Sequence, residues 1–113
     1  MELLVIIIEQ EKHLRPILDQ FYERDISGAT VIDSKGMGHL IADHIPIFAQ
    51  FAELNRSNEL CKTIFTVVED EEKMETAIRI VEETVGDLTE PDTGMFFTVP
   101  ISHARGYRTR LTE

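Results

Sequence analysis

Basic residues are scarce in this sequence, and their scarcity excludes a large class of partners. The 113 residues contain 11 Lys and Arg against 21 Asp and Glu, a formal net charge of −10 at pH 7. A nucleic acid or an anionic membrane normally binds to a broad basic surface. We therefore expect neither partner, and we expect any phosphate site to be confined to a few residues.

Cysteine and long apolar runs are also in short supply. The single Cys61 cannot form a disulfide within the chain, and we predict that it is a buried small side chain rather than a reactive thiol. No apolar run approaches the roughly 20 residues of a membrane span. Met1 leads into ELLVIIIEQ without the basic start of a secretory signal. These absences predict a cytoplasmic protein.

Recognisable catalytic motifs are missing as well. The sequence has no serine nucleophile elbow, no Cys and His pair at a known spacing and no Walker phosphate loop. Carboxylates are numerous, but most fall on the solvated face of one expected helix, where charge is usual. Because a catalytic site needs convergent groups rather than many groups, we predict that the protein is not an enzyme.

A chain of 113 residues has the length of one domain, which we take as residues 1–113. Since 42% of the residues are apolar, the chain has enough apolar side chains for a core. Apolar patterns predict strands at residues 3–8, 28–34, 62–68 and 94–101. One helix is expected at about 13–24, and a second between the acidic stretch 69–72 and Gly86. The order βαββαβ predicts an α+β, ferredoxin-like sandwich, a four-stranded antiparallel sheet with two helices on one face.

The second face of this sheet poses a packing problem, because two helices cover only one face. Residues 3–8 are apolar without a break, and so are Met95, Phe96 and Phe97. A strand with one wetted face alternates apolar and polar residues instead. We therefore expect other copies of the chain to cover the second face, with a gain of about 25 cal/mol per Å² of apolar area.

Residues 35–60 form a long connection between two strands, and such connections are commonly functional. The segment is too apolar to stay solvated, and PIFAQFAEL, which begins at Pro46, predicts a short helix. Two roles remain open for it: packing on a neighbouring subunit, or docking on a target protein.

Three potential metal ligands, His39, Asp43 and His44, lie in the same connection, and His103 is a conceivable fourth. Three ligands without a zinc-protease motif or a Cys-rich cage favour ordinary histidines over a metal site. A metal-binding protein on the same fold, similar to the CutA family, is therefore the alternative hypothesis.

The stretches SGATVIDSKGMGH and TIFTVVEDEEKMETAIRIVEETVGD, followed by a glycine-flanked loop and a final strand, resemble the nitrogen-regulatory P-II signalling proteins, in particular their divergent relatives. The resemblance covers about residues 2–108. It implies a homotrimer with inward-facing sheets and an adenine nucleotide (ATP, ADP or AMP) in the clefts between subunits. It also implies that residues 35–60 regulate an enzyme or transporter of nitrogen or related metabolism.

The same resemblance places a set of residues around the nucleotide: Thr30, Gly36, Met37, Gly38, Val67, Val68, Gly86, Gly94 and Met95. The sequence departs from the family pattern at three points. Met95 replaces a basic residue, a residue around Leu40 replaces the glutamine that helps to hold magnesium and oxoglutarate, and the long loop lacks the modified tyrosine. These differences argue against oxoglutarate sensing and tyrosine modification.

The glycine-flanked loop carries three acids, Asp87, Glu90 and Asp92, and no Lys or Arg. Two unit charges 4 Å apart interact by about 4 kcal/mol at an effective dielectric of 20, so these acids oppose a triphosphate. Compensation is available from Arg105, Arg108 and Arg110 after the last strand, unless this segment is a solvated tail. The loop therefore favours a less charged ligand, a cation-linked ligand, or none.

Overall fold

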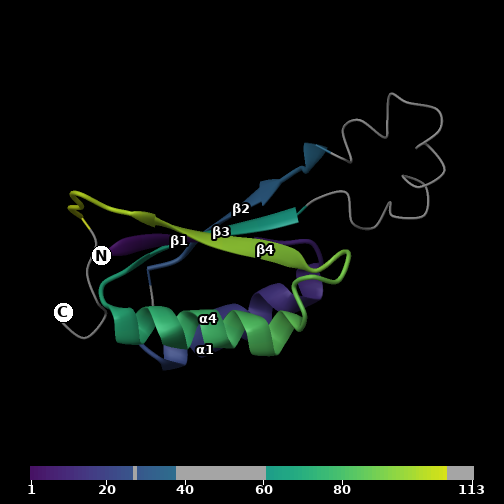
Figure 1. Ribbon diagram of the computed structural model, residues 1–113, viewed down its shortest axis with the longest axis horizontal. Coiled ribbons are helices and arrows are strands. Elements are labelled where there is room, and N and C mark those ends of the chain that lie inside the picture. The colour runs from purple at the N-terminus through teal and green to yellow at the C-terminus, as the bar shows by residue number, and fades with distance from the viewer. Residues whose placement is uncertain (27, 38–60, 107–113) are drawn as a thin grey trace.

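The computed structural model describes residues 1–26, 28–37 and 61–106 (Figure 1). The elements follow the order β1 (Glu2–Ile8), η1 (Glu11–His13), α1 (Leu14–Glu23), β2 (Thr30–Ser34), β3 (Cys61–Val68), α4 (Glu71–Val85) and β4 (Gly94–Pro100). The strands form one antiparallel sheet in the order β2-β3-β1-β4. Both helices lie on one side of this sheet (Figure 1). The predicted βαββαβ order and two-layer architecture are therefore confirmed.

Helix α4 begins and ends where local chemistry favours it. The carboxylate of Asp70 accepts a hydrogen bond of 2.8 Å from the Lys73 N–H, and Glu71 and Glu72 occupy the first turn. Gly86 follows the last turn with a φ of 93°. Acidic side chains at the start of a helix and a glycine after its end are both stabilising. These are the boundaries expected from the sequence.

The cap at Asp70 gives a first testable prediction. Asp70→Ala removes the acceptor for the Lys73 N–H and is expected to lower the free energy of unfolding by about 1 kcal/mol. Asp70→Ser keeps a capping oxygen at the same position and is expected to lose much less. Urea unfolding followed by circular dichroism measures both variants, and equal losses would contradict the assigned cap.

The core lies between the sheet and the two helices. Leu4, Ile6 and Ile8 of β1 alternate with residues of the other face and point into this core. They pack with residues of β3, α1 and α4: Ile64, Ile17, Phe21, Ala77 and Val81. Helix α4 buries Met74, Ala77, Val81 and Val85 at helical spacing. Ile80 is also buried, at 4% exposed, whereas Ile78 is only partly buried. Because α4 packs on α1 as well as on the sheet, it buries a wider arc than one stripe.

The opposite face of the sheet, which we call the open face, is apolar. Strand register places Leu3, Val5 and Ile7 beside Val67, Phe65 and Thr63 on β3 and beside Val99, Phe97 and Met95 on β4. Met95, Phe97 and Val99 are 51, 42 and 42% exposed, and Ile32 of β2 is 46% exposed. The predicted apolar second face is confirmed, and its cover by other copies stays a prediction.

Some predictions fall on residues outside the described ranges. They concern the short helix beginning at Pro46 and the metal ligands His39, Asp43 and His44. Among the described residues, no helix is both long and apolar enough to cross a membrane. Those same residues contain no group of three His, Cys, Asp or Glu side chains that could hold a metal ion. His103 is exposed.

Candidate functional site

The loop between α4 and β4 satisfies much of its own hydrogen bonding. The Asp87 carboxylate accepts bonds from the Thr89 N–H (2.9 Å) and the Thr89 hydroxyl (2.6 Å). The Glu90 N–H donates to the Asp87 carbonyl at 3.1 Å, and the Thr93 hydroxyl donates to the Glu90 carbonyl at 2.8 Å. The amides of Thr89 and Glu90 are therefore already occupied and are not free to bind a phosphate.

Two further contacts attach this loop to the end of β1. The side-chain amide of Gln10 donates to the Asp92 carbonyl at 3.0 Å, and the Glu9 N–H donates to the Thr93 carbonyl at 3.3 Å. Both bonds use the loop backbone, so the three acidic side chains remain on the surface. The loop is thus a fixed, negatively charged turn beside the first strand.

The ionisation of Asp87 is tied to this turn. Hydrogen bonds from the Thr89 side chain and then from its backbone lower the pKa of Asp87. Because the pKa of Asp87 in the folded state lies below its usual value, the ionised carboxylate stabilises the folded state at neutral pH. This contribution to stability is lost as the pH falls through the folded-state pKa. At neutral pH the loop therefore presents a carboxylate where a phosphate site would need positive charge.

Glycine is required at the start of β4 for a steric reason. Gly94 has a φ of 137°, and a Cβ atom built on it would lie 2.1 Å from the Ile7 carbonyl oxygen. Gly86 also has a positive φ, 93°, but a Cβ there would meet nothing within 4 Å. The second glycine therefore permits the close approach of two strands rather than the approach of a ligand.

An ion-pair network joins the elements at the base of the 35–60 connection. The ammonium group of Lys62 on β3 lies 2.5 Å from an Asp33 carboxylate oxygen on β2 and 3.3 Å from a Glu11 carboxylate oxygen on η1. Hydrogen bonds to Asp33 and then Glu11 raise the pKa of Lys62, so it remains protonated. The network holds together the two strands between which residues 35–60 leave and return.

Polar side chains next to this network tie the ends of β2 and β3. The hydroxyls of Ser34 and Thr63 share a hydrogen bond of 2.7 Å, and the Ser34 hydroxyl lies 3.4 Å from the Cys61 carbonyl. Cys61 is 4% exposed, and burial is the main cause that raises its pKa. The prediction of a buried Cys61 is confirmed.

The structure divides the residues predicted around the nucleotide between the two ends of the sheet. Ile8, the last residue of β1, pairs with Lys62 near the start of β3 and with Gly94 at the start of β4. The end of β2 pairs with the start of β3, so these strand ends all lie at the same end of the sheet. Gly36, Met37, Gly86, Gly94 and Met95 lie toward that end. Val67 and Val68 belong to the other end, since Val68 pairs with Glu2. Gly38 and Arg108 lie outside the described residues.

The predicted residues are also divided between the two edges of the sheet. Strands β2 and β4 are the outer strands, with β3 and β1 between them, and three interstrand spacings amount to about 14 Å. Thr30 is exposed on the open face, as Met95 is, but at the opposite edge. A single chain therefore does not gather the predicted residues into one pocket.

Two neighbouring valines face different layers. Val67 pairs with Leu3 on the open face and is partly buried. Val68 is 3% exposed and belongs to the core between sheet and helices. Residues next to each other in a strand point to opposite faces, so only Val67 is available to a ligand that binds on the open face.

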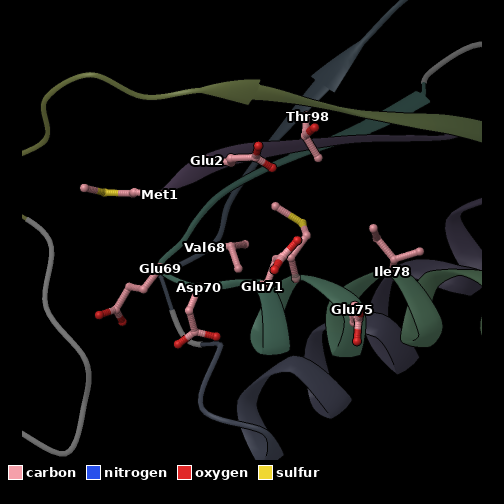
Figure 2. Close-up of a pocket in the computed structure, with 10 residues that line it drawn as sticks. Met1, Glu2, Val68, Glu69, Asp70, Glu71, Glu75, Ile78 and Thr98 are labelled. Atoms are coloured by element: carbon pink, nitrogen blue, oxygen red, sulfur yellow. The ribbon is translucent and has the colours of Figure 1, made fainter.

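A hollow of about 390 Å³ at the start of α4 was not expected from the sequence. Glu2 and Thr98 lie on its strand side, and Glu71, Glu75 and Ile78 lie on its α4 side (Figure 2). The acidic stretch 69–72 is the signal available in the sequence, and by itself it predicts only the start of a helix. The void itself depends on the distance between the strand ends and the first turns of α4, which the sequence pattern does not show.

The architecture defines the class of the protein: an α+β sandwich in which four antiparallel strands in the order β2-β3-β1-β4 carry two helices on one face. The profile of the family "Nitrogen regulatory protein P-II" matches residues 1–111, so this chain belongs to the P-II family of signalling regulators. The family resemblance inferred from the sequence is thereby confirmed.

One solved structure supports the fold independently. The crystal structure of Arabidopsis thaliana PII bound to citrate matches with a TM-score of 0.59 and 18% sequence identity. The match covers 89% of this chain and 77% of that chain. No curated protein matches this chain. At such an identity the likeness is one of fold, and the ligand in that crystal is a property of that protein.

Proposed function

We propose that this protein is a non-enzymatic signalling regulator that works as a homotrimer. In this proposal each cleft between subunits binds a small ligand, ATP, ADP or AMP, and residues 35–60 act on a target enzyme or transporter of nitrogen or related metabolism. The open face is the observation that carries the proposal. Because Met95, Phe97 and Val99 are exposed on a sheet whose other face is covered, association of copies buries them.

The distribution of the predicted ligand residues supports a shared site. Thr30 and Gly36 belong to one edge of the sheet and Gly94 and Met95 to the other, so two copies meeting edge to edge bring complementary sets together. A cleft of this kind also allows a cation from one copy to offset Asp87, Glu90 and Asp92 of another. Arg105 and Arg108 are the candidates for that role.

Isothermal titration with ATP, ADP and AMP tests the proposed ligand class. We expect saturable heat with at least one of them, at one site per chain. The double variant Arg105→Ala, Arg108→Ala is expected to weaken the binding of ATP more than that of AMP. Arg24→Ala, which removes one positive charge after α1, is a control for the effect of surface charge. The absence of heat for all three nucleotides in a folded trimer would remove adenine nucleotides from the proposal.

The acidic loop gives a separate prediction about phosphates. Glu90 is exposed and its carboxylate is not part of the loop's hydrogen bonds. If a triphosphate reaches the loop, Glu90→Gln is expected to tighten the binding of ATP by roughly fivefold. The reason is that two unit charges 4 Å apart in water repel each other by about 1 kcal/mol. AMP affinity is expected to change little. Equal changes for ATP and AMP would place the β- and γ-phosphates elsewhere.

A further inference from the structure

The hollow at the start of α4 combines an apolar floor with an open rim. Val68 and Met74 are 3 and 8% exposed, and Ile78 is partly buried against the core. These side chains already pack on one side, yet about 390 Å³ beside them is unfilled by the described residues. Protein interiors are close-packed, so a space of this size with an apolar floor can receive a side chain from another segment.

The rim of the hollow is acidic. The lining residues include Glu2, Glu69, Asp70, Glu71 and Glu75, and no Lys or Arg. Two of these acids have partners: Glu69 lies 3.7 Å from the Lys73 ammonium, and Asp70 caps α4. Among the described residues, Glu2, Glu71 and Glu75 make no ion pair.

These features match the chemistry of an arginine side chain. Its methylene stem can lie on apolar surface while its guanidinium bonds carboxylates. The hollow supplies both kinds of contact. Met74 and Ile78 offer apolar surface to the stem, and Glu71 and Glu75 offer carboxylates to the guanidinium. A phosphate or another anion would be repelled by the same rim.

The only dense basic cluster of the chain leaves the sheet beside this hollow. Pro100 pairs with Glu2, and the Ile101 N–H donates to the Met1 carbonyl at 3.2 Å, while Met1, Glu2 and Thr98 all line the hollow. The following HARGYRTR contains Arg105, Arg108 and Arg110. Arg105 is exposed and makes no ion pair with any described residue. At about 3.3 Å per residue, the nine steps from residue 101 to residue 110 can span up to roughly 30 Å.

We propose that, without nucleotide, the end of the basic C-terminal segment of the same chain, residues 107–110 with Arg108 and Arg110, docks in this hollow. Its arginines lie along Met74 and Ile78, and their guanidinium groups meet Glu71 and Glu75. The docked segment fills the apolar void and neutralises part of the acidic rim. This contact does not depend on the proposed nucleotide, and it is tested without any nucleotide.

A single tryptophan reports on the docking. The sequence contains no Trp, so full-length Tyr107→Trp carries one probe next to Arg108. We expect blue-shifted emission and weak quenching by acrylamide at low salt. At 1 M salt, where the screening length is about 3 Å, the emission is expected to move to the value of a solvated indole.

Matched variants of α4 separate docking from a general charge effect. In the Tyr107→Trp background, Glu71→Gln with Glu75→Gln is expected to lower the ratio of docked to free segment by roughly fivefold, because exposed ion pairs are individually weak. Glu82→Gln with Glu83→Gln removes the same charge from exposed positions of the same helix that do not line the hollow. This control is expected to leave the emission unchanged. Circular dichroism verifies that every variant is folded.

Several outcomes would overturn the proposal. A solvated indole in the parent Tyr107→Trp protein, or emission that responds equally to both pairs of substitutions, means that the hollow does not hold the segment. A third comparison uses the Phe97→Glu background, in which the copies are expected to separate. Shielding that persists there supports docking within one chain, whereas loss of shielding assigns the segment to a neighbouring copy and overturns the same-chain contact.

Discussion

Replacing Phe97 with glutamate is expected to convert the assembled protein into folded single chains. Phe97 is 42% exposed on the open face and pairs with Val5, which pairs in turn with Phe65 at the centre of the sheet. A carboxylate placed in an apolar interface costs several kcal/mol unless it finds a partner, and no cation lies among these neighbouring pairs. The side chain points away from the core, so the fold itself is expected to survive.

Sedimentation velocity at micromolar concentration measures this effect. The parent chain is expected to sediment as a trimer and Phe97→Glu as a monomer with an unchanged circular dichroism spectrum. Tyr22→Glu is the matched control, because Tyr22 is 61% exposed on α1, in the helical layer. A folded parent protein that is monomeric, or a Phe97→Glu variant that keeps the parent's mass, would contradict the assembly and the shared ligand site with it.

The open face also shows how far the sequence determines the fold. Unbroken apolar runs at residues 3–8 and 95–97 predicted that both faces of the sheet need cover, and the strand register places Val5 and Phe97 on the face without helices. An alternation of apolar and polar residues cannot show which face a residue belongs to here, because the residues on both faces of these strands are apolar. The information lay in the mismatch between two predicted helices and two apolar faces. The number of copies that resolve the mismatch is not encoded in that pattern.

The ligand site was less accessible to sequence reasoning. The family resemblance placed both Val67 and Val68 at the ligand, but adjacent strand residues face opposite layers, and Val68 is in the core. The resemblance likewise placed both Gly86 and Gly94 at the ligand, yet their surroundings differ: an added Cβ atom would meet the Ile7 backbone at Gly94 and open space at Gly86. Such distinctions depend on which strands are neighbours, and this is decided by tertiary packing. The acids of α4 show the same limit, since the hollow beside them exists only in three dimensions.

The strongest test of the fold is the substitution Gly94→Ala. A Cβ at this position would lie 2.1 Å from the Ile7 carbonyl oxygen, a backbone atom that cannot rotate away. The φ of 137° is also one that residues with side chains rarely adopt. Strand β4 must therefore move away from β1 near the Ile8–Gly94 pair, at one end of their ladder. We expect the free energy of unfolding to fall by about 3 kcal/mol or more.

Gly86→Ala separates the steric effect from the conformational one. Its φ of 93° is also positive, but the new methyl group would meet no atom within 4 Å. The expected loss is therefore the conformational cost alone, about 1–2 kcal/mol. Urea unfolding of both variants under identical conditions provides the comparison, with protein concentration held fixed because association contributes to stability. Equal losses would mean that the strand contact at Gly94 relaxes easily, whereas a larger loss at Gly94 would show that the close approach of β1 and β4 is what requires the glycine.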